Sequence, residues 1–157
     1  MIMMTAPQIV TAYMEQTRQD LIKSYQDKGL KASGKYEKGL TYTVEDDGKK
    51  IHAVIESEGH VWFMEKGRGP NKQQTAKQAR SLGKILEQWV KDKGIDVNPY
   101  AAAWKIVREG IDVPNKNNPG KVVEGVVTNE WYDELVEQLR QHWIFVVQTQ
   151  VERLFRK

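Results

Sequence analysis

The C-terminal part of the chain carries the pattern that most constrains its fold. Apolar side chains recur at helical spacing from Asn129 to Leu154, which predicts a helix over 129–154, about twice the mean helix length. Within it, the run Trp143-Ile144-Phe145-Val146-Val147 is entirely apolar. A helix with such a run is apolar on every side, so it must be covered from more than one direction. In a chain of 157 residues, a partner subunit is the natural cover for this helix.

Three other segments also show helical periodicity. The first, 6–28, follows Thr5 as a capping residue and has Pro7 in its first turn, where a missing N–H costs little. The second, 78–93, places apolar residues at positions i, i+3, i+4, i+7 and i+8. The third, 99–109, begins after Asn98, and a glycine ends it. All three are predicted to be amphipathic helices.

Between the first two of these helices the apolar period changes to two, which is typical of strands. One alternating run begins at Leu40, and a second follows the turn signal Asp47-Gly48. A third strand is predicted at Val61–Lys66, after a turn at Glu58-Gly59, so the segment 40–66 is predicted to be an antiparallel meander. Residues 121–127 are predicted to form either a fourth strand or a small hairpin, and the pattern does not decide between them.

These elements predict one α+β domain over 1–157. A small antiparallel sheet of three to four strands should pack against amphipathic helices, with the long helix at the C-terminus. Residues 67–77 contain two glycines and a proline among polar residues, and are predicted to form an exposed loop.

Composition excludes several classes of protein. The chain has no cysteine, which rules out disulfides, thiolate metal sites and a cysteine nucleophile, and is compatible with a reducing cytoplasm. Its 24 basic and 21 acidic residues nearly cancel, whereas a dedicated duplex-DNA binder usually has a denser basic face. Because no apolar stretch approaches the ~20 residues that span a bilayer, no membrane partner is expected.

No candidate for catalysis is strong. Gly67–Lys72 resembles a phosphate-binding loop in its glycines but lacks the Gly-Lys-Ser/Thr ending, so a contact loop is the preferred interpretation. Glu56, Glu58 and His60 alternate and would share one face of a regular strand, but Gly59 interrupts that strand and a solvated edge explains them better. The serines lie in no nucleophile motif. We therefore predict no enzyme, catalytic residue, metal, cofactor or small-molecule substrate.

A basic cluster supports an alternative function, that of a nucleic-acid-binding accessory protein. Its positive side chains run from the end of the sheet into the following helix, and Trp62 or Tyr36 could stack on bases. The members of the cluster are Lys66, Arg68, Lys72, Lys77, Arg80 and Lys84. The simpler interpretation of such a cluster is a solvated surface.

Four sequence blocks within residues 30–111 follow one another in an order that a known family shares. They are Ala32-Ser33-Gly34 before the strands, Trp62-Phe63-Met64-Glu65-Lys66-Gly67-Arg68-Gly69-Pro70, Trp89-Val90-Lys91-Asp92-Lys93-Gly94, and Ala103 to Gly110 ending in Arg108-Glu109-Gly110. In order and content they resemble the tail-completion or head–tail joining proteins of tailed double-stranded DNA bacteriophages. One departure is Asn71-Lys72-Gln73-Gln74, where relatives often carry prolines.

This resemblance implies a structural virion protein that occupies the head–tail interface, after assembly in the host cytoplasm. It implies a ring of about six copies between the head connector and the tail tube, around the channel that the DNA crosses. The expected partners are copies of the chain itself, the phage head-completion or connector proteins, the tail-tube protein, and double-stranded DNA in transit. The residues expected at these contacts are Lys66, Arg68, Pro70, Lys72, Trp143, Ile144, Phe145 and Val147.

Overall fold

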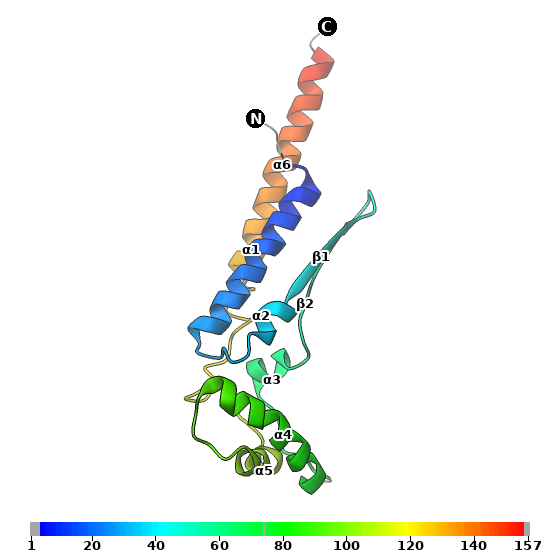
Figure 1. Ribbon diagram of the computed structural model, residues 1–157. Helices are drawn as coiled ribbons and strands as arrows, with labels where there is room; N and C mark the ends of the chain where they lie inside the picture. The colour runs from blue at the N-terminus through cyan, green and yellow to red at the C-terminus, as the bar shows by residue number, and fades with distance from the viewer. Residues whose placement is uncertain (1–3, 74, 156–157) are drawn as a thin grey trace.

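The computed structural model describes residues 4–73 and 75–155. In chain order its elements are α1 (Ala6–Asp27), α2 (Lys35–Gly39), β1 (Thr41–Asp46), β2 (Ile51–Glu56), α3 (Val61–Lys66), α4 (Thr75–Lys93), α5 (Pro99–Glu109) and α6 (Asn129–Phe155). Helices α1 and α6 run antiparallel, the β1–β2 hairpin extends beside α1, and α4 and α5 lie at the other end of the molecule (Figure 1). The predicted α+β class, with an antiparallel sheet and a long C-terminal helix, is confirmed.

Helix α1 forms the centre of the upper half of the molecule. It begins with a capping box, in which the Thr5 hydroxyl accepts from the Gln8 backbone N–H and the Gln8 side chain accepts from the Thr5 N–H at 2.8 Å. Its buried residues Val10, Tyr13 and Met14 contact apolar side chains of both α6 and the hairpin. The layers are therefore α6, α1 and the two-stranded sheet, in that order.

Two hydrogen bonds fix the contact between α1 and the beginning of α6. The Tyr13 hydroxyl donates to the Trp131 carbonyl at 2.6 Å, and the Trp131 indole N–H donates to the Thr17 hydroxyl at 2.8 Å. The Tyr13 and Trp131 rings also pack at 5.3 Å between centroids. Both polar groups of these aromatic residues have partners, so the hydrogen bonds offset the cost of removing these groups from water.

A second apolar cluster lies at the C-terminal end of α1. It joins Leu21 and Tyr25 to Tyr36 on α2, to Leu40, and to Val122 from the segment before α6. The Tyr25 and Tyr36 rings lie 4.3 Å apart. Val122 is fully buried, so this cluster holds the connection 121–127 against the body of the protein.

The sheet has two strands rather than the three to four that were predicted. Strands β1 and β2 pair in register from Thr41 with Glu56 to Asp46 with Ile51, and the turn lies at the predicted Asp47-Gly48. The Asp47 carboxylate accepts the backbone N–H groups of Lys49 and Lys50, both at 2.7 Å.

The prediction of a third strand at Val61–Lys66 was wrong, because this segment is helix α3. In a helix Val61, Met64 and Glu65 lie on one side, and this side packs toward the second cluster while Trp62 and Phe63 stay exposed. The segment begins with four consecutive apolar residues, and so short an apolar run is compatible with either a strand or a helix.

The prediction of a strand or hairpin at 121–127 was also wrong, since these residues form consecutive turns. The Glu65 carboxylate accepts the backbone N–H groups of Val122, Val123 and Glu124, at 2.7, 3.1 and 3.0 Å. These donors are therefore not available to a strand ladder. Lys121, with φ of 55°, begins the turn in the left-handed region.

Helices α4 and α5 pack closely against each other. The Asn98 side chain caps α5 by accepting from the Tyr100 and Ala101 N–H groups, both at 3.0 Å. Gly83 lies directly under Tyr100, whose ring would be 2.4 Å from a Cβ at that position. Helix α4 begins at Thr75, earlier than the predicted 78, so the loop that precedes it is shorter than 67–77. Across 4–73 and 75–155, none of the helices has the length and apolarity to cross a membrane.

Candidate interaction surfaces

One side of α6 carries a row of exposed apolar side chains. Trp143, Val147 and Leu154 are 56%, 58% and 74% exposed. Spacings of 3, 4 and 7 residues place them on one side of the helix together with four other half-exposed apolar residues. We define this outer stripe as Tyr132, Val136, Trp143, Ile144, Val147, Val151 and Leu154.

The outer stripe is distinct from the side of α6 that contacts α1. That inner side carries Trp131, Leu135 and Leu139, which pack on α1. The last turns of α6 extend past the beginning of α1, and no other helix or strand of the described residues lies beside them (Figure 1). Of the predicted interface residues, Trp143, Ile144 and Val147 belong to the outer stripe. Phe145, which is 48% exposed, lies on another side of the helix.

Of the other predicted contact residues, Lys66 ends α3, and Arg68, Pro70 and Lys72 lie in the following loop, which is bonded to α5 through the Asn71 N–H and the Val107 carbonyl. Arg68 pairs with Ile111 through two backbone hydrogen bonds of 2.9 and 2.8 Å. Pro70 and Lys72 are exposed, while Arg68 is half-buried and its guanidinium donates to the Asn71 side chain. The loop is near α4 and α5, so the structure does not bring these residues together with the C-terminal half of α6 (Figure 1).

Two glycines explain how this loop approaches α5 so closely. Gly67 and Gly110 have φ of 73° and 82°, and a Cβ on either would lie 2.0 or 2.4 Å from a carbonyl oxygen of the opposite segment. Only glycine fits both the backbone conformation and the space. The Gly-Arg-Gly-Pro block is therefore shaped in part by packing within the chain.

A groove that the sequence did not predict lies between α2, β2, α3 and the 121–127 turns. Its volume is about 810 Å³, and its lining is mainly apolar. Three exposed carboxylates, Glu56, Glu58 and Glu124, lie at its rim, with Lys66 as the basic side chain among its lining residues. Its apolar lining residues are Leu21, Tyr36, Leu40, Ile55, Val61, Trp62, Val123 and Val127. Because α1, through Leu21, also contributes to this groove, five separate segments form it, and no local sequence pattern could reveal it.

Two polar groups lie in the wall of this groove. The Glu65 carboxylate is occupied by the three N–H groups of the 121–127 turns. Tyr36 is 2% exposed, and its hydroxyl has no hydrogen-bond partner within the described ranges. Burial is the main cause that raises the pKa of Tyr36 to about 12, and nearby Tyr25, Glu65 and Glu37 add to it. Its hydroxyl is therefore a neutral donor at physiological pH.

The residues weighed as metal ligands do not form a three-ligand site. The His60 imidazole lies 3.3 Å from the Glu58 carboxylate, and Glu56 ends β2. Among residues 4–73 and 75–155, no three His, Cys, Asp or Glu side chains are grouped as they would be to hold a metal ion.

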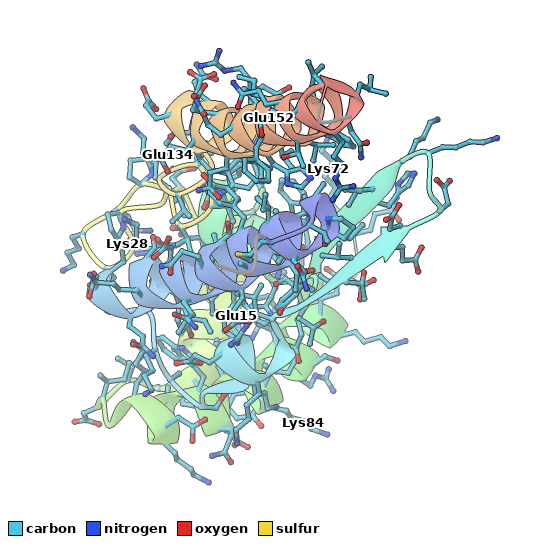
Figure 2. All side chains as sticks on the ribbon, turned by 90° about the horizontal axis from the view of Figure 1, so that it is seen from above. Glu15, Lys28, Lys72, Lys84, Glu134 and Glu152 are labelled. Atoms are coloured by element: carbon cyan, nitrogen blue, oxygen red, sulfur yellow. The ribbon has the colours of Figure 1, made fainter. Side chains whose placement is uncertain are left out.

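The basic cluster is divided by the structure. Lys66 lies over the Trp62 ring at 5.9 Å, and Arg68 lies over Phe63 at 5.8 Å. Lys77, Arg80 and Lys84 instead share one side of α4 beside Ser81 and line a shallow hollow there. Figure 2 shows Lys84 on the opposite side of the molecule from α6. The cluster therefore provides a short basic face on α4 rather than one continuous surface.

Comparison of the chain with protein-family models, with curated proteins and with solved structures finds no match.

Proposed function

We propose that this protein is a structural subunit of the neck of a tailed bacteriophage. About six copies form a ring that joins the head connector to the tail tube around the DNA channel. The observation that carries the proposal is the outer stripe of α6, which needs a cover that the described chain does not supply. The order of sequence blocks described above supports the choice of a phage neck over other assemblies.

The outer stripe can drive association of useful strength. Burying a large apolar side chain stabilises by about 1.5–3 kcal/mol, and these side chains are roughly half exposed. The stripe as a whole therefore offers about 5–10 kcal/mol before the entropy cost of association. That range suits a subunit that is stable alone and assembles at high local concentration or on a template.

The first test is the mass of the purified protein by light scattering, over a wide concentration range and at low and high salt. We expect a discrete closed oligomer, which negative-stain microscopy should show as a ring. Val147→Asp should convert it to monomers, because the carboxylate would be buried in an apolar contact. Gln148→Asp is the matched control, since it adds the same charge one residue away from the stripe and should still assemble.

The subunit could instead form its ring only on the head connector or the tail tube. The isolated protein would then be a monomer that co-sediments with the connector or the tail tube, and Val147→Asp should abolish this binding. A protein that stays monomeric and binds neither partner would overturn the proposed function.

The basic face of α4 favours one second candidate, the binding of nucleic acid. None of Lys77, Arg80 and Lys84 forms an ion pair with a described residue, so their charges are free to meet phosphates. This candidate predicts micromolar or tighter affinity for duplex DNA, with a steep dependence on salt. Fluorescence anisotropy with the double variant Arg80→Ala/Lys84→Ala tests it. Weak binding that the variant leaves unchanged would remove this candidate and would suit a conduit through which DNA must slide.

A further inference from the structure

Two surfaces described above lie far apart on the chain and have complementary properties. One is the end of α6, which we call the α6 tip and define as Val147, Val151, Arg153 and Leu154. Its apolar members belong to the outer stripe and are exposed, and Arg153 is exposed beside them. The other is the groove between α2, β2, α3 and the 121–127 turns.

The shapes and polarity of these two surfaces match. The α6 tip presents a narrow apolar ridge, in which Val147, Val151 and Leu154 lie on one side of a helix. The groove is an apolar hollow of about 810 Å³, and Trp62, which is 68% exposed, stands in its wall. A helix laid into an apolar groove through residues at this spacing is a common mode of protein recognition.

The charges also match. The rim of the groove carries Glu56, Glu58 and Glu124. The exposed end of α6 carries Arg153 beside the apolar ridge, and Lys66 is the basic side chain in the groove lining. In the contact Arg153 of one copy meets the acidic rim of the next, which orients the contact and favours it over pairing of two α6 tips, where the two Arg153 side chains would meet.

We infer that the α6 tip of one copy seats in the groove of the next copy. The two surfaces cannot meet within one chain, because the α6 tip lies at one end of the molecule and α3, which lines the groove, lies toward the other end, near α4 (Figure 1). The contact joins two different surfaces, so it runs head to tail and yields a ring when its rotation closes. The inference rests on the proposed function, in which copies of this chain form a ring, and it names the surfaces they use.

Thiol cross-linking tests this contact directly, because the natural chain has no cysteine. One protein carries Leu154→Cys at the α6 tip, and a second, isotope-labelled protein carries Ser57→Cys in the groove lining. The two are mixed and treated with a short bis-maleimide, and the products are weighed by mass spectrometry. The matched control replaces the second protein with Ser81→Cys, an exposed serine on α4 far from the groove. Circular dichroism first establishes that each variant is folded.

We expect a mixed covalent dimer from Leu154→Cys with Ser57→Cys, and none with Ser81→Cys. Arg153→Glu in the tip protein should abolish the product, and Glu58→Lys in the groove protein should restore it. Absence of the mixed dimer, or efficient cross-linking of Leu154→Cys to itself, would overturn the inference.

Failure of the inference is distinguishable from failure of the proposed function. A discrete ring by light scattering without the mixed dimer keeps the function and removes this contact. A mixed dimer in a protein that forms only open chains keeps this contact and removes the ring.

Discussion

Replacing Glu65 with glutamine should cost much of the stability of this protein. The side chain is 9% exposed, and its two oxygens accept three backbone N–H groups, those of Val122, Val123 and Glu124, at 2.7–3.1 Å. Glutamine keeps one oxygen, which can accept at most the two bonds now made by Oε2. Its amide group would then point an N–H at the third donor.

The loss can be estimated from these contacts. Three hydrogen bonds to a charged acceptor contribute about 2 kcal/mol each, and two neutral bonds that replace them contribute about 1 kcal/mol each. Glu65→Gln should therefore lower the free energy of unfolding by about 4 kcal/mol. With a urea dependence of about 2 kcal/mol per molar, the unfolding midpoint should fall by about 2 M.

Urea unfolding followed by circular dichroism measures this shift. Glu109→Gln is the control, because it removes the same charge from an exposed position and should change stability by less than about 0.5 kcal/mol. Amide hydrogen exchange should also show lost protection at Val122, Val123 and Glu124. A midpoint that moves no further for Glu65→Gln than for Glu109→Gln would refute the role given to this carboxylate.

Three further substitutions test other contacts. Gly83→Ala should destabilise by about 1–3 kcal/mol, because its Cβ would overlap the Tyr100 ring, and thermal unfolding would contradict this if the melting temperature stayed unchanged. The pKa of Tyr36 is raised to about 12, so between about pH 10 and 12 the folded state keeps a proton that the unfolded state has lost. The free energy of unfolding should therefore fall as the pH rises through this range. In Tyr36→Phe, which has no such proton, it should fall less steeply. Urea unfolding at pH 9 and pH 11 measures this, and equal slopes for the two proteins would disprove it. Trp131→Phe removes the donor to the Thr17 hydroxyl and should cost about 1–3 kcal/mol, a loss that unchanged thermal stability would rule out.

The elements with local signals were the predictable ones. Thr5 and Pro7 indicate the beginning of α1, Asn98 indicates that of α5, and Asp47-Gly48 marks the hairpin turn, because each acts on the backbone within a few residues. The length of α6 follows from a periodicity sustained over many turns. Its exposed outer side could be expected for the same reason, since the run around Phe145 is apolar on every side.

The errors arise where contacts distant in sequence decide the structure. Glu65 determines the form of the 121–127 turns from 57 to 59 positions away, and nothing near Val122 reveals this partner. Helix α3 is too short for periodicity to identify it, because a run of four apolar residues is compatible with either a strand or a helix. The groove was missed for the same reason, because its wall exists only after α2, α3 and the turns have met. Sequence periodicity identifies which side of a helix is apolar, but not the cavity that forms between several segments.

The backbone pairing of Arg68 with Ile111 also has a consequence for how this fold can vary. Gly67 and Gly110 allow the backbone before α4 to contact the backbone after α5. The segment that contains α4 and α5 therefore begins and ends at the same place in the fold. A longer, shorter or differently charged helical pair could be grafted between these two anchor points without displacing the strands or α6. The fold thus confines α4 and α5 to one insertion, whose two ends meet at a single backbone pairing.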